Sequence, residues 1–81
     1  MGNVYLPELG EGIEKATIAY WHAAVGDLVS EDDDIVEVVT DKATFNVSAG
    51  ALGVVKKICV KEGQMAKIGE VLAVIDSSES Q

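Results

Sequence analysis

The stretch that decides the fold class lies at the middle of the chain and reads Ile35-Val36-Glu37-Val38-Val39-Thr40-Asp41-Lys42-Ala43-Thr44-Phe45-Asn46-Val47-Ser48. Two runs rich in β-branched residues, 35–40 and 44–48, flank the polar break Thr40-Asp41-Lys42-Ala43. Short β-branched runs on either side of a polar break are typical of consecutive strands. The stretch therefore predicts a β-hairpin with Lys42 at its tip.

Similar short runs continue outward from this hairpin in both directions. They predict further strands near residues 3–6, 17–24, 54–61 and 71–75, and short extra strands around Gly26 to Ser30 and Gly63 to Lys67. No segment has a sustained helical period. A chain of 81 residues holds one small core. We therefore expect a single all-β domain over residues 1–76, followed at 77–81 by the start of a flexible linker.

The two halves of the chain resemble each other at a shift of 37 residues. Seven positions of the second half then fall on similar positions of the first: Val55 on Ile18, Ile58 on Trp21, Val60 on Ala23, Gly63 on Gly26, Met65 on Leu28, Leu72 on Ile35 and Ile75 on Val38. Two units that are each too small to bury an apolar face share one core, and two copies are too few for a solenoid. The repeat predicts a flattened β-barrel or sandwich of two four-stranded antiparallel sheets with internal pseudo-two-fold symmetry.

The repeat also predicts an irregularity in two matched strands. Ile18 has one strand parity, whereas Trp21 and Ala23 have the other, and the second half repeats this mismatch. Strict alternation would place these apolar residues on opposite faces of the sheet. We expect a bulge or a sheet corner between them, because an extra residue would turn all of them toward the core.

Strand direction and symmetry predict how the loops are distributed. A two-fold axis places the Lys42 turn and the chain termini at opposite ends of the domain. The loop from Pro7 to Lys15 is then expected at the Lys42 end, and the loop from Gly50 to Leu52 at the far end.

Composition excludes several classes of function. The net charge is −8, with 14 acidic and 6 basic residues, so the chain repels phosphate backbones and nucleic acid is not an expected partner. No apolar run reaches the roughly 20 residues that span a bilayer. One cysteine allows no internal disulfide. No secretory or transit segment precedes the first predicted strand, and we expect the bacterial cytoplasm rather than the mitochondrial matrix.

The sequence contains no set of residues that predicts a catalytic or metal site. His22 and Cys59 are the only histidine and cysteine, and the repeat makes them symmetry mates. We interpret them as a strand histidine and a small strand hydrophobe. The acidic run Glu31-Asp32-Asp33-Asp34 lacks calcium-loop spacing and predicts a solvated turn. Leu9-Gly10-Glu11-Gly12 predicts a flexible loop rather than a phosphate-binding one, because no third glycine follows.

Lys42 allows two interpretations on pattern alone. A turn lysine is usually exposed and serves solubility, here loosely paired with Asp41. A lysine at a hairpin tip in the centre of a duplicated β domain is also a fixed, accessible attachment point for a modifying ligase. The pattern favours neither.

A set of motifs and single residues, spread over roughly residues 3–76, occurs together in this chain. The set consists of Thr40-Asp41-Lys42-Ala43, Leu6-Pro7-Glu8-Leu9-Gly10-Glu11-Gly12-Ile13, Trp21, Gly26-Asp27, Gly53, Gly63 and Gly69. In this set the chain resembles the lipoyl domains of acyltransferase subunits of 2-oxo acid dehydrogenase complexes, within the biotinyl/lipoyl-attachment family. The chain departs from the family at Asp32, at Phe45-Asn46 and at Ala49. None of these departures falls on Lys42, which matches the lysine that carries lipoamide in the family.

Two alternatives remain beside the lipoyl interpretation. A biotin carboxyl-carrier domain resembles this one in fold, but its modified lysine typically lies between two methionines, whereas Asp41 and Ala43 flank Lys42. A β-sandwich interaction module without a prosthetic group is the other. The glycine-cleavage H protein also carries lipoyl-lysine, but it resembles a longer chain with extra elements. The length of this chain and its opening motif Leu9-Gly10-Glu11-Gly12 argue against it.

The resemblance implies a carrier with no active site of its own. Lipoate would form an amide with Nζ of Lys42, with Asp41 and Ala43 as the turn that a lipoate ligase or lipoyl transferase recognises. The arm would serve a 2-oxo acid decarboxylase, the catalytic domain of the parent acyltransferase and a dihydrolipoamide dehydrogenase. We expect these partners to contact Glu8, Glu11, Glu14 and Phe45, and the isolated domain to be monomeric.

Overall fold

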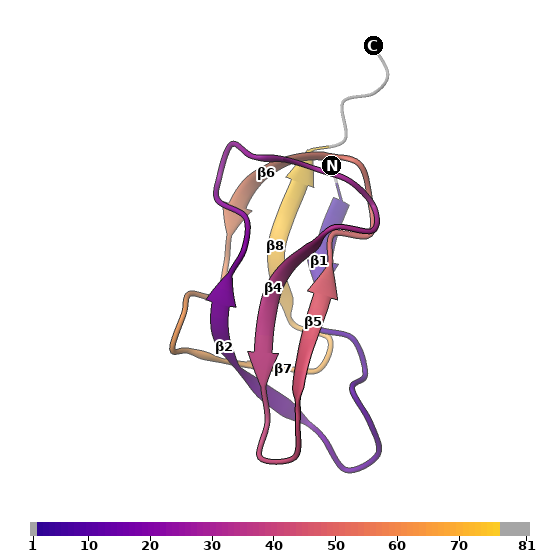
Figure 1. The fold of residues 1–81 in the computed structure, drawn as a ribbon, viewed down its shortest axis with the longest axis vertical. Coiled ribbons are helices and arrows are strands. Elements are labelled where there is room, and N and C mark those ends of the chain that lie inside the picture. Colours follow the sequence, from indigo (N-terminus) through magenta and orange to yellow (C-terminus); the bar gives the residue numbers. More distant parts are fainter. Residues whose placement is uncertain (1, 77–81) are drawn as a thin grey trace.

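The computed structural model describes residues 2–76, and they form eight strands in two antiparallel sheets (Figure 1). The strands are β1 Gly2–Tyr5, β2 Lys15–Trp21, β3 Leu28–Val29, β4 Asp34–Val39, β5 Thr44–Ser48, β6 Gly53–Ile58, β7 Met65–Lys67 and β8 Val71–Asp76. One sheet has the order β1-β8-β6-β3 and the other β5-β4-β2-β7. The predicted flattened sandwich of two four-stranded sheets is confirmed. The linker predicted at 77–81 lies outside the described residues.

Symmetry relates the two sheets strand by strand. Shifting β2, β3 and β4 by 37 residues gives β6, β7 and β8, and these occupy the equivalent positions of the other sheet. Loop contacts repeat too. The Gly26 amide donates to the Val55 carbonyl at 2.8 Å, and the Gly63 amide donates to the Ile18 carbonyl at 2.8 Å. Each turn therefore attaches to the opposite sheet in the same way, so the symmetry extends to these turns.

Bulges interrupt the two long central pairs at matching positions. The register between β2 and β4 shifts between Ile18 and Tyr20, and that between β6 and β8 shifts between Val55 and Lys57. Each shift changes the face on which the following residues lie. Trp21 is consequently half-buried against the core although its parity differs from that of Ile18. The predicted bulge is confirmed in both halves.

Two predicted strands end earlier than expected. β2 stops at Trp21 rather than at residue 24, and β6 stops at Ile58 rather than at residue 61. The cause is side-chain capping of the turns that follow. The Asp27 carboxylate accepts the Ala24 amide at 2.9 Å, and the Gln64 side-chain carbonyl accepts the Lys61 amide at 2.9 Å. These bonds compete with continued pairing of the strand.

The early strand ends correct the interpretation of His22 and Cys59. Both residues follow the last strand residue, in bends, and both are exposed. Their amides still donate to the opposite strand, to the carbonyls of Ile35 and Leu72 at 2.8 Å each. Cys59 is therefore not packed as a small hydrophobe. Its backbone is held at the sheet while its side chain faces solvent.

The core lies between the two sheets and consists of apolar side chains. Among residues 2–76 no polar or charged residue is buried. The central strands contribute consecutive buried residues, Ile35 and Val36 in β4 and Leu72 and Ala73 in β8. Register shifts at the edge pairs, β4 with β5 and β1 with β8, permit two neighbours to face inward. The described segment contains no helix that is long and apolar enough to span a membrane.

Gly53 lies where β6 begins beside the end of β8, and it tolerates no side chain. A Cβ there would lie 2.5 Å from the Asp76 carbonyl oxygen and 2.7 Å from Cγ2 of Ile75. Because the closest atom is backbone, the two strands must move apart.

We expect Gly53→Ala to lower the free energy of unfolding by about 2 kcal/mol, within the range for overpacking. Urea unfolding measures this, with Gly2→Ala as the control, since no atom lies within 4 Å of a Cβ there. Equal stability of the two variants would contradict the close approach.

Candidate functional site

Lys42 is exposed at the tip of the β4–β5 hairpin. The last strand pair is Val39 with Thr44, and residues 40–43 form the turn. This hairpin extends toward one end of the domain, while β1 begins and β8 ends near the other (Figure 1). The prediction that Lys42 and the termini lie at opposite ends is confirmed for the described residues.

Thr40 holds the turn in place with its hydroxyl group. Its Oγ1 accepts the amides of Lys42 and Ala43 at 3.1 Å each and lies 3.1 Å from the Ala43 carbonyl, to which the hydroxyl donates. The Thr40 amide also donates to that carbonyl at 2.9 Å. No residue of the turn has a positive φ. A polar side chain at the start of the turn therefore replaces the glycine that many hairpins require.

Thr40 belongs to the predicted polar break, but no role was predicted for it from the sequence. The signal that could have identified it is a threonine immediately before the two residues at the tip. Ser and Thr hydroxyls bind nearby backbone amides in turns. Thr40 is therefore a positioning residue, which fixes the direction in which the backbone of Lys42 presents its side chain.

We expect Thr40→Val to lower the free energy of unfolding by about 1 kcal/mol, because two amides lose their intramolecular acceptor and must turn to water. The modification rate of Lys42 by a ligase is expected to fall severalfold, since the tip loses its fixed direction. Thermal unfolding and initial modification rates measure the two effects. Thr40→Ser retains the hydroxyl and is the matched control. Unchanged rates in Thr40→Val would show that the hydroxyl does not position the tip.

The loop of residues 6–14 lies at the Lys42 end, as predicted. Its start is fixed by Leu6, whose amide donates to the Glu70 carbonyl at 2.9 Å and whose carbonyl accepts the Gly69 amide at 2.8 Å. The loop then reaches the hairpin at Gly12, which has a φ of +84°. A Cβ on Gly12 would lie 3.9 Å from Nζ of Lys42. The loop and the lysine side chain are therefore neighbours.

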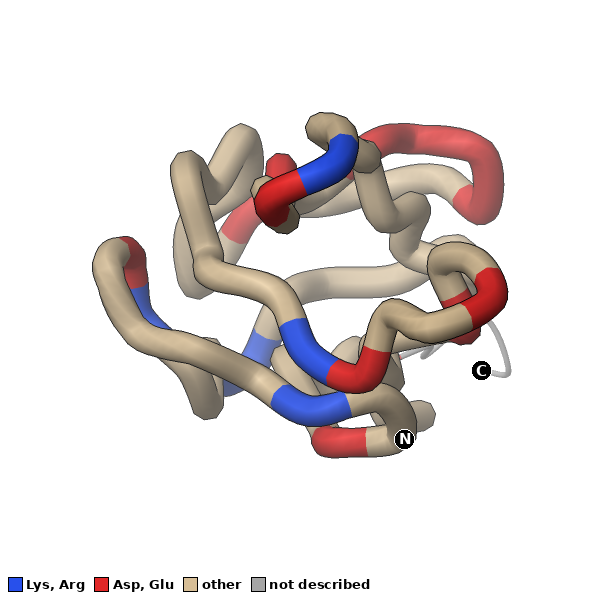
Figure 2. The backbone as a smooth tube through the Cα atoms, turned by 90° about the horizontal axis from the view of Figure 1, so that it is seen from below, with Lys and Arg blue, Asp and Glu red and all other residues tan. Residues whose placement is uncertain are grey.

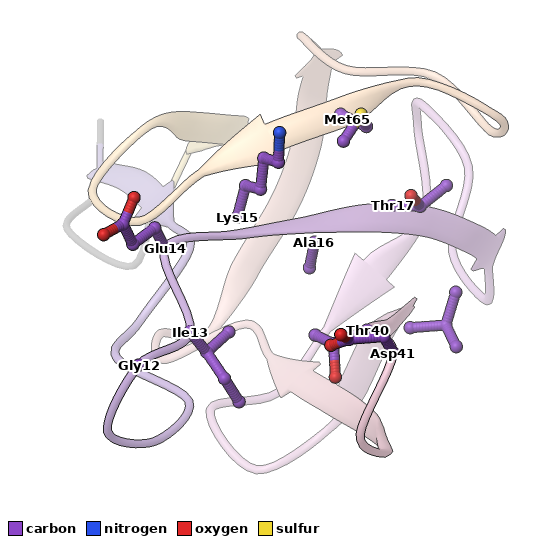
Figure 3. Close-up of a pocket in the computed structure, with 10 residues that line it drawn as sticks. Gly12, Ile13, Glu14, Lys15, Ala16, Thr17, Thr40, Asp41 and Met65 are labelled. Atoms are coloured by element: carbon purple, nitrogen blue, oxygen red, sulfur yellow. The ribbon is translucent and has the colours of Figure 1, made fainter.

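An open groove of about 440 Å³ lies beside the turn. It is lined by three segments that are distant in sequence, namely residues 12–17, residues 39–41 and Met65. In Figure 3, Ile13, Ala16 and Thr40 lie around the space between the 6–14 loop and the hairpin, and Met65 lies across β2 from Ala16. Asp41 lines this groove, and Ala43 is exposed beside Lys42.

The residues predicted to contact partners are distributed unevenly. Glu8, Glu11 and Glu14 are exposed on the 6–14 loop and line a shallow depression there. Phe45, in contrast, pairs with the buried Val38 and packs half-buried against the core. Only part of its ring is accessible. Figure 2 looks onto this end and shows acidic segments next to basic ones rather than a uniformly acidic face.

The remaining polar candidates lie elsewhere. The run Glu31–Asp34 is exposed, and the Asp33 carboxylate accepts the Ser30 amide at 2.8 Å, which confirms the predicted turn. The Glu31 carbonyl accepts the Gly50 amide at 3.0 Å, so this turn lies with the 50–52 loop, far from Lys42. Residues 2–76 contain no group of three or more His, Cys, Asp or Glu side chains placed to hold a metal.

Comparison with known proteins identifies relatives of this fold and site. The family model Biotin_lipoyl, described as biotin-requiring enzyme, matches residues 2–75. The dihydrolipoyllysine-residue acetyltransferase component of the pyruvate dehydrogenase complex is 36% identical over 76 residues, both in Staphylococcus aureus and in Staphylococcus epidermidis. The match covers 94% of this chain and 18% of either relative, so the chain spans less than a fifth of their length.

Two solved structures are similar as well. The lipoyl domain of the 2-oxoglutarate dehydrogenase complex from Azotobacter vinelandii has a TM-score of 0.72 at 35% identity, covering 91% of this chain and 94% of that one. Kluyveromyces lactis urea carboxylase has a TM-score of 0.78 at 29% identity, covering 93% of this chain and 6% of that one. Because the family model matches residues 2–75 of this chain, the chain belongs to the biotinyl/lipoyl-attachment family of carrier domains.

Proposed function

We propose that the chain is the lipoyl carrier domain of an acyltransferase subunit in a 2-oxo acid dehydrogenase complex, with lipoate joined by an amide to Nζ of Lys42. The observation that carries the proposal is the position of this lysine. It is exposed on a turn that Thr40 holds rigidly, at the end of the domain opposite the last described residue. A ligase can therefore reach the amine without unfolding any part of the sheet.

The sequence of the turn favours lipoate over biotin, whereas the fold does not discriminate. Urea carboxylase is at least as similar in structure as the lipoyl domain, judged by TM-score. At the turn, however, Asp41 and Ala43 flank the lysine in place of the methionines typical of biotinyl domains. Met65 lies on β7 and lines the groove rather than flanking Lys42. The 2-oxo acid dehydrogenase relatives support the same choice.

The residues present fit a covalently attached lipoyl group. An exposed amine on a short turn can be acylated, and the groove beside it leaves space for an attached chain. When bound, lipoamide supplies a dithiolane that can be reduced, carry an acyl group and be reoxidised. The protein contributes position: Thr40 fixes the turn, and Gly12 leaves room next to Nζ.

The partners follow from this assignment as proposals. A lipoate ligase or lipoyl transferase would read Asp41 and Ala43 beside the lysine. The 2-oxo acid decarboxylase, the parent acyltransferase's catalytic domain and dihydrolipoamide dehydrogenase would contact the 6–14 loop through Glu8, Glu11 and Glu14, with the accessible edge of Phe45. Rim charges of this kind act mainly on the association rate. Residues 1–76 would form the carrier domain and 77–81 would begin the linker to the rest of a bacterial, cytoplasmic subunit.

Intact-mass spectrometry tests the proposal directly. The chain is produced with a lipoate ligase, a biotin ligase and both vitamins, and the adduct is identified by mass and located by peptide mapping. A lipoyl adduct on Lys42 is the expected result. A biotinyl adduct would assign the chain to the biotinyl branch, and an unmodified chain would leave only the interaction-module alternative.

Moving the lysine by one position is expected to abolish modification. In the double variant Lys42→Ala with Ala43→Lys, the composition and the net charge are unchanged, and both positions are exposed. The amine then leaves the tip that Thr40 fixes, so a ligase that reads geometry cannot align it. Modification is measured by intact mass, and folding by thermal unfolding, which should match the parent chain. Efficient labelling of the moved lysine would show that the ligase reads only an exposed amine.

A further inference from the structure

Half of the lysines of this acidic chain line a second groove, which we call the Trp21 groove. It is open, has a volume of about 600 Å³ and is lined by Trp21, Val25, Lys56, Lys57, Ile58, Lys61 and Glu62. Figure 1 shows β6 and the end of β2 on the same side of the sandwich, across from β1 and β5. Within residues 2–76, this groove shares no lining residue with the groove beside Lys42. A molecule bound in it therefore need not cover the attachment turn.

The fold does not require lysines at these positions. The shift of 37 residues pairs the three lysines with uncharged mates: Lys56 with Ala19, Lys57 with Tyr20 and Lys61 with Ala24. The mates occupy the equivalent strand and turn of the other sheet. The positive charge is therefore particular to the second half of the chain and is not imposed by the backbone that both halves share.

A bulge in β6 turns two consecutive lysines outward. The register with β8 shifts between Val55 and Lys57, which makes Lys56 the extra residue of the bulge. Lys56 and Lys57 are both exposed, although strict alternation would place them on opposite faces of the sheet. Lys61 lies in the turn after β6, where its amide donates to the Gln64 side chain at 2.9 Å. The three ammonium groups are therefore carried on a well-held backbone around one groove.

Trp21 provides most of the apolar surface of the groove. Its indole Nε1 donates to the Val60 carbonyl at 2.8 Å, and its backbone amide donates to Oε2 of Glu62 at 2.9 Å. The ring is half-buried, so these bonds fix its orientation while part of its surface stays accessible. Val25, which is 59% exposed, and the half-buried Ile58 extend the apolar surface. Because the indole N–H already has an acceptor, the accessible part of the ring offers an apolar contact.

We propose that the Trp21 groove is a docking site for a short acidic segment of a partner protein, with one apolar side chain as its anchor. The anchor packs against the indole of Trp21, and the carboxylates beside it pair with the lysines. Charge complementarity indicates this partner, because the described lining residues carry three lysines and a single acid, Glu62. Screening limits these charges to about 8 Å. A membrane would also face the rest of a chain whose net charge is −8, whereas a short segment contacts the groove alone.

Fluorescence of the tryptophan tests the docking site. Trp21 is the only tryptophan of the chain, so its emission reports on the groove directly. The probe is the end-blocked peptide Asp-Glu-Phe-Leu-Asp-Glu, which contains no tryptophan or tyrosine. We expect a saturable change of the emission, and about tenfold weaker binding of the uncharged analogue Asn-Gln-Phe-Leu-Asn-Gln, since several exposed ion pairs are lost together. An unchanged emission at millimolar peptide, or equal binding of both peptides, would overturn the proposal.

Two charge-matched double variants locate the binding. Lys56→Glu with Lys57→Glu reverses charges in the groove, whereas Lys15→Glu with Lys67→Glu makes the same change of net charge at a cross-strand pair of β2 and β7. Binding is expected to weaken about tenfold in the first variant and less than twofold in the second. Lys61→Glu, outside any strand, should weaken it severalfold. Thermal unfolding verifies that each variant is folded. Equal weakening in both double variants would show that only net charge matters and would refute the site.

Co-sedimentation with vesicles distinguishes a peptide from a lipid surface. The vesicles contain equal parts of phosphatidylcholine and phosphatidylserine, and we expect the chain to stay in the supernatant. Sedimentation that is lost in Lys56→Glu with Lys57→Glu would replace the acidic segment by an anionic membrane as the occupant. All of these measurements use the unmodified chain, so their outcome does not depend on the proposed attachment of lipoate to Lys42.

Discussion

Replacing Lys42 by arginine is expected to abolish lipoylation completely while leaving the fold unchanged. A guanidinium group is not acylated by a ligase that uses an amine. The hydrogen bonds of the turn come from the backbone amide of residue 42 and from Thr40, not from the lysine side chain, so arginine maintains the turn and its charge. Intact mass of the chain co-produced with a lipoate ligase measures the loss.

The other lysines provide the control for this experiment. The chain has six, and Lys15 lies on β2, at the Lys42 end but outside the turn. Lys15→Arg is expected to be lipoylated as fully as the parent chain. An adduct on Lys42→Arg, mapped to any remaining lysine, would show that the attachment site has been assigned wrongly.

Truncating either of two symmetry-related core residues is expected to remove a large part of the stability. Ile35 on β4 and Leu72 on β8 are both fully buried, at 0% exposure. Each alanine variant loses buried methyl groups and leaves a cavity between the sheets, which typically costs about 2–5 kcal/mol. We expect about 3 kcal/mol for each, and a fall in Tm of roughly 12–24 °C for a domain of this size.

Equality of the two losses is the stringent part of this prediction. Equivalent positions in the two sheets have equivalent surroundings, so the losses in Ile35→Ala and Leu72→Ala should agree within about 1 kcal/mol, a narrower range than the roughly 2–5 kcal/mol over which such truncations vary. Val25→Ala, at an exposed residue, is the control and should change stability little. If only one of the two variants lost stability, the two halves would not contribute equally to the free energy of unfolding, which would contradict the prediction. Urea unfolding of the three variants decides this.

Much of the fold could be predicted because the pattern of apolar and glycine positions occurs twice in the chain, at a shift of 37 residues. The repeat predicted two four-stranded sheets related by pseudo-two-fold symmetry, and the parity mismatch between Ile18 and Trp21 predicted the bulge that the structure shows. The positions at which strands end were harder to predict. β2 stops at Trp21 because the Asp27 carboxylate caps a turn, and a single cap is a weak signal beside a run of apolar residues.

The candidate site was predictable in position but not in detail. The midpoint of a duplicated chain placed Lys42 at an exposed tip. The role of Thr40 depends on which atoms its hydroxyl meets, and the proximity of Gly12 to Nζ depends on how a loop folds back, so neither follows from a pattern of residue types. Phe45 was expected to contact partners, and the sequence did not show how much of its ring is accessible: its cross-strand partner is the buried Val38, so the ring packs partly against the core.

The placement of Lys42 opposite the last residue of β8 affects how much space the carrier can explore. A strand of six residues is about 20 Å long, and β4 and β8 both have that length. For a domain tethered beyond residue 76, this length adds to the radius within which the lysine moves. The accessible volume grows with the cube of the radius, so under the proposed function a given tether would bring the lysine to more distant partner sites than a lysine beside the termini could reach. A rigid sandwich adds this distance without the entropy of a longer flexible chain.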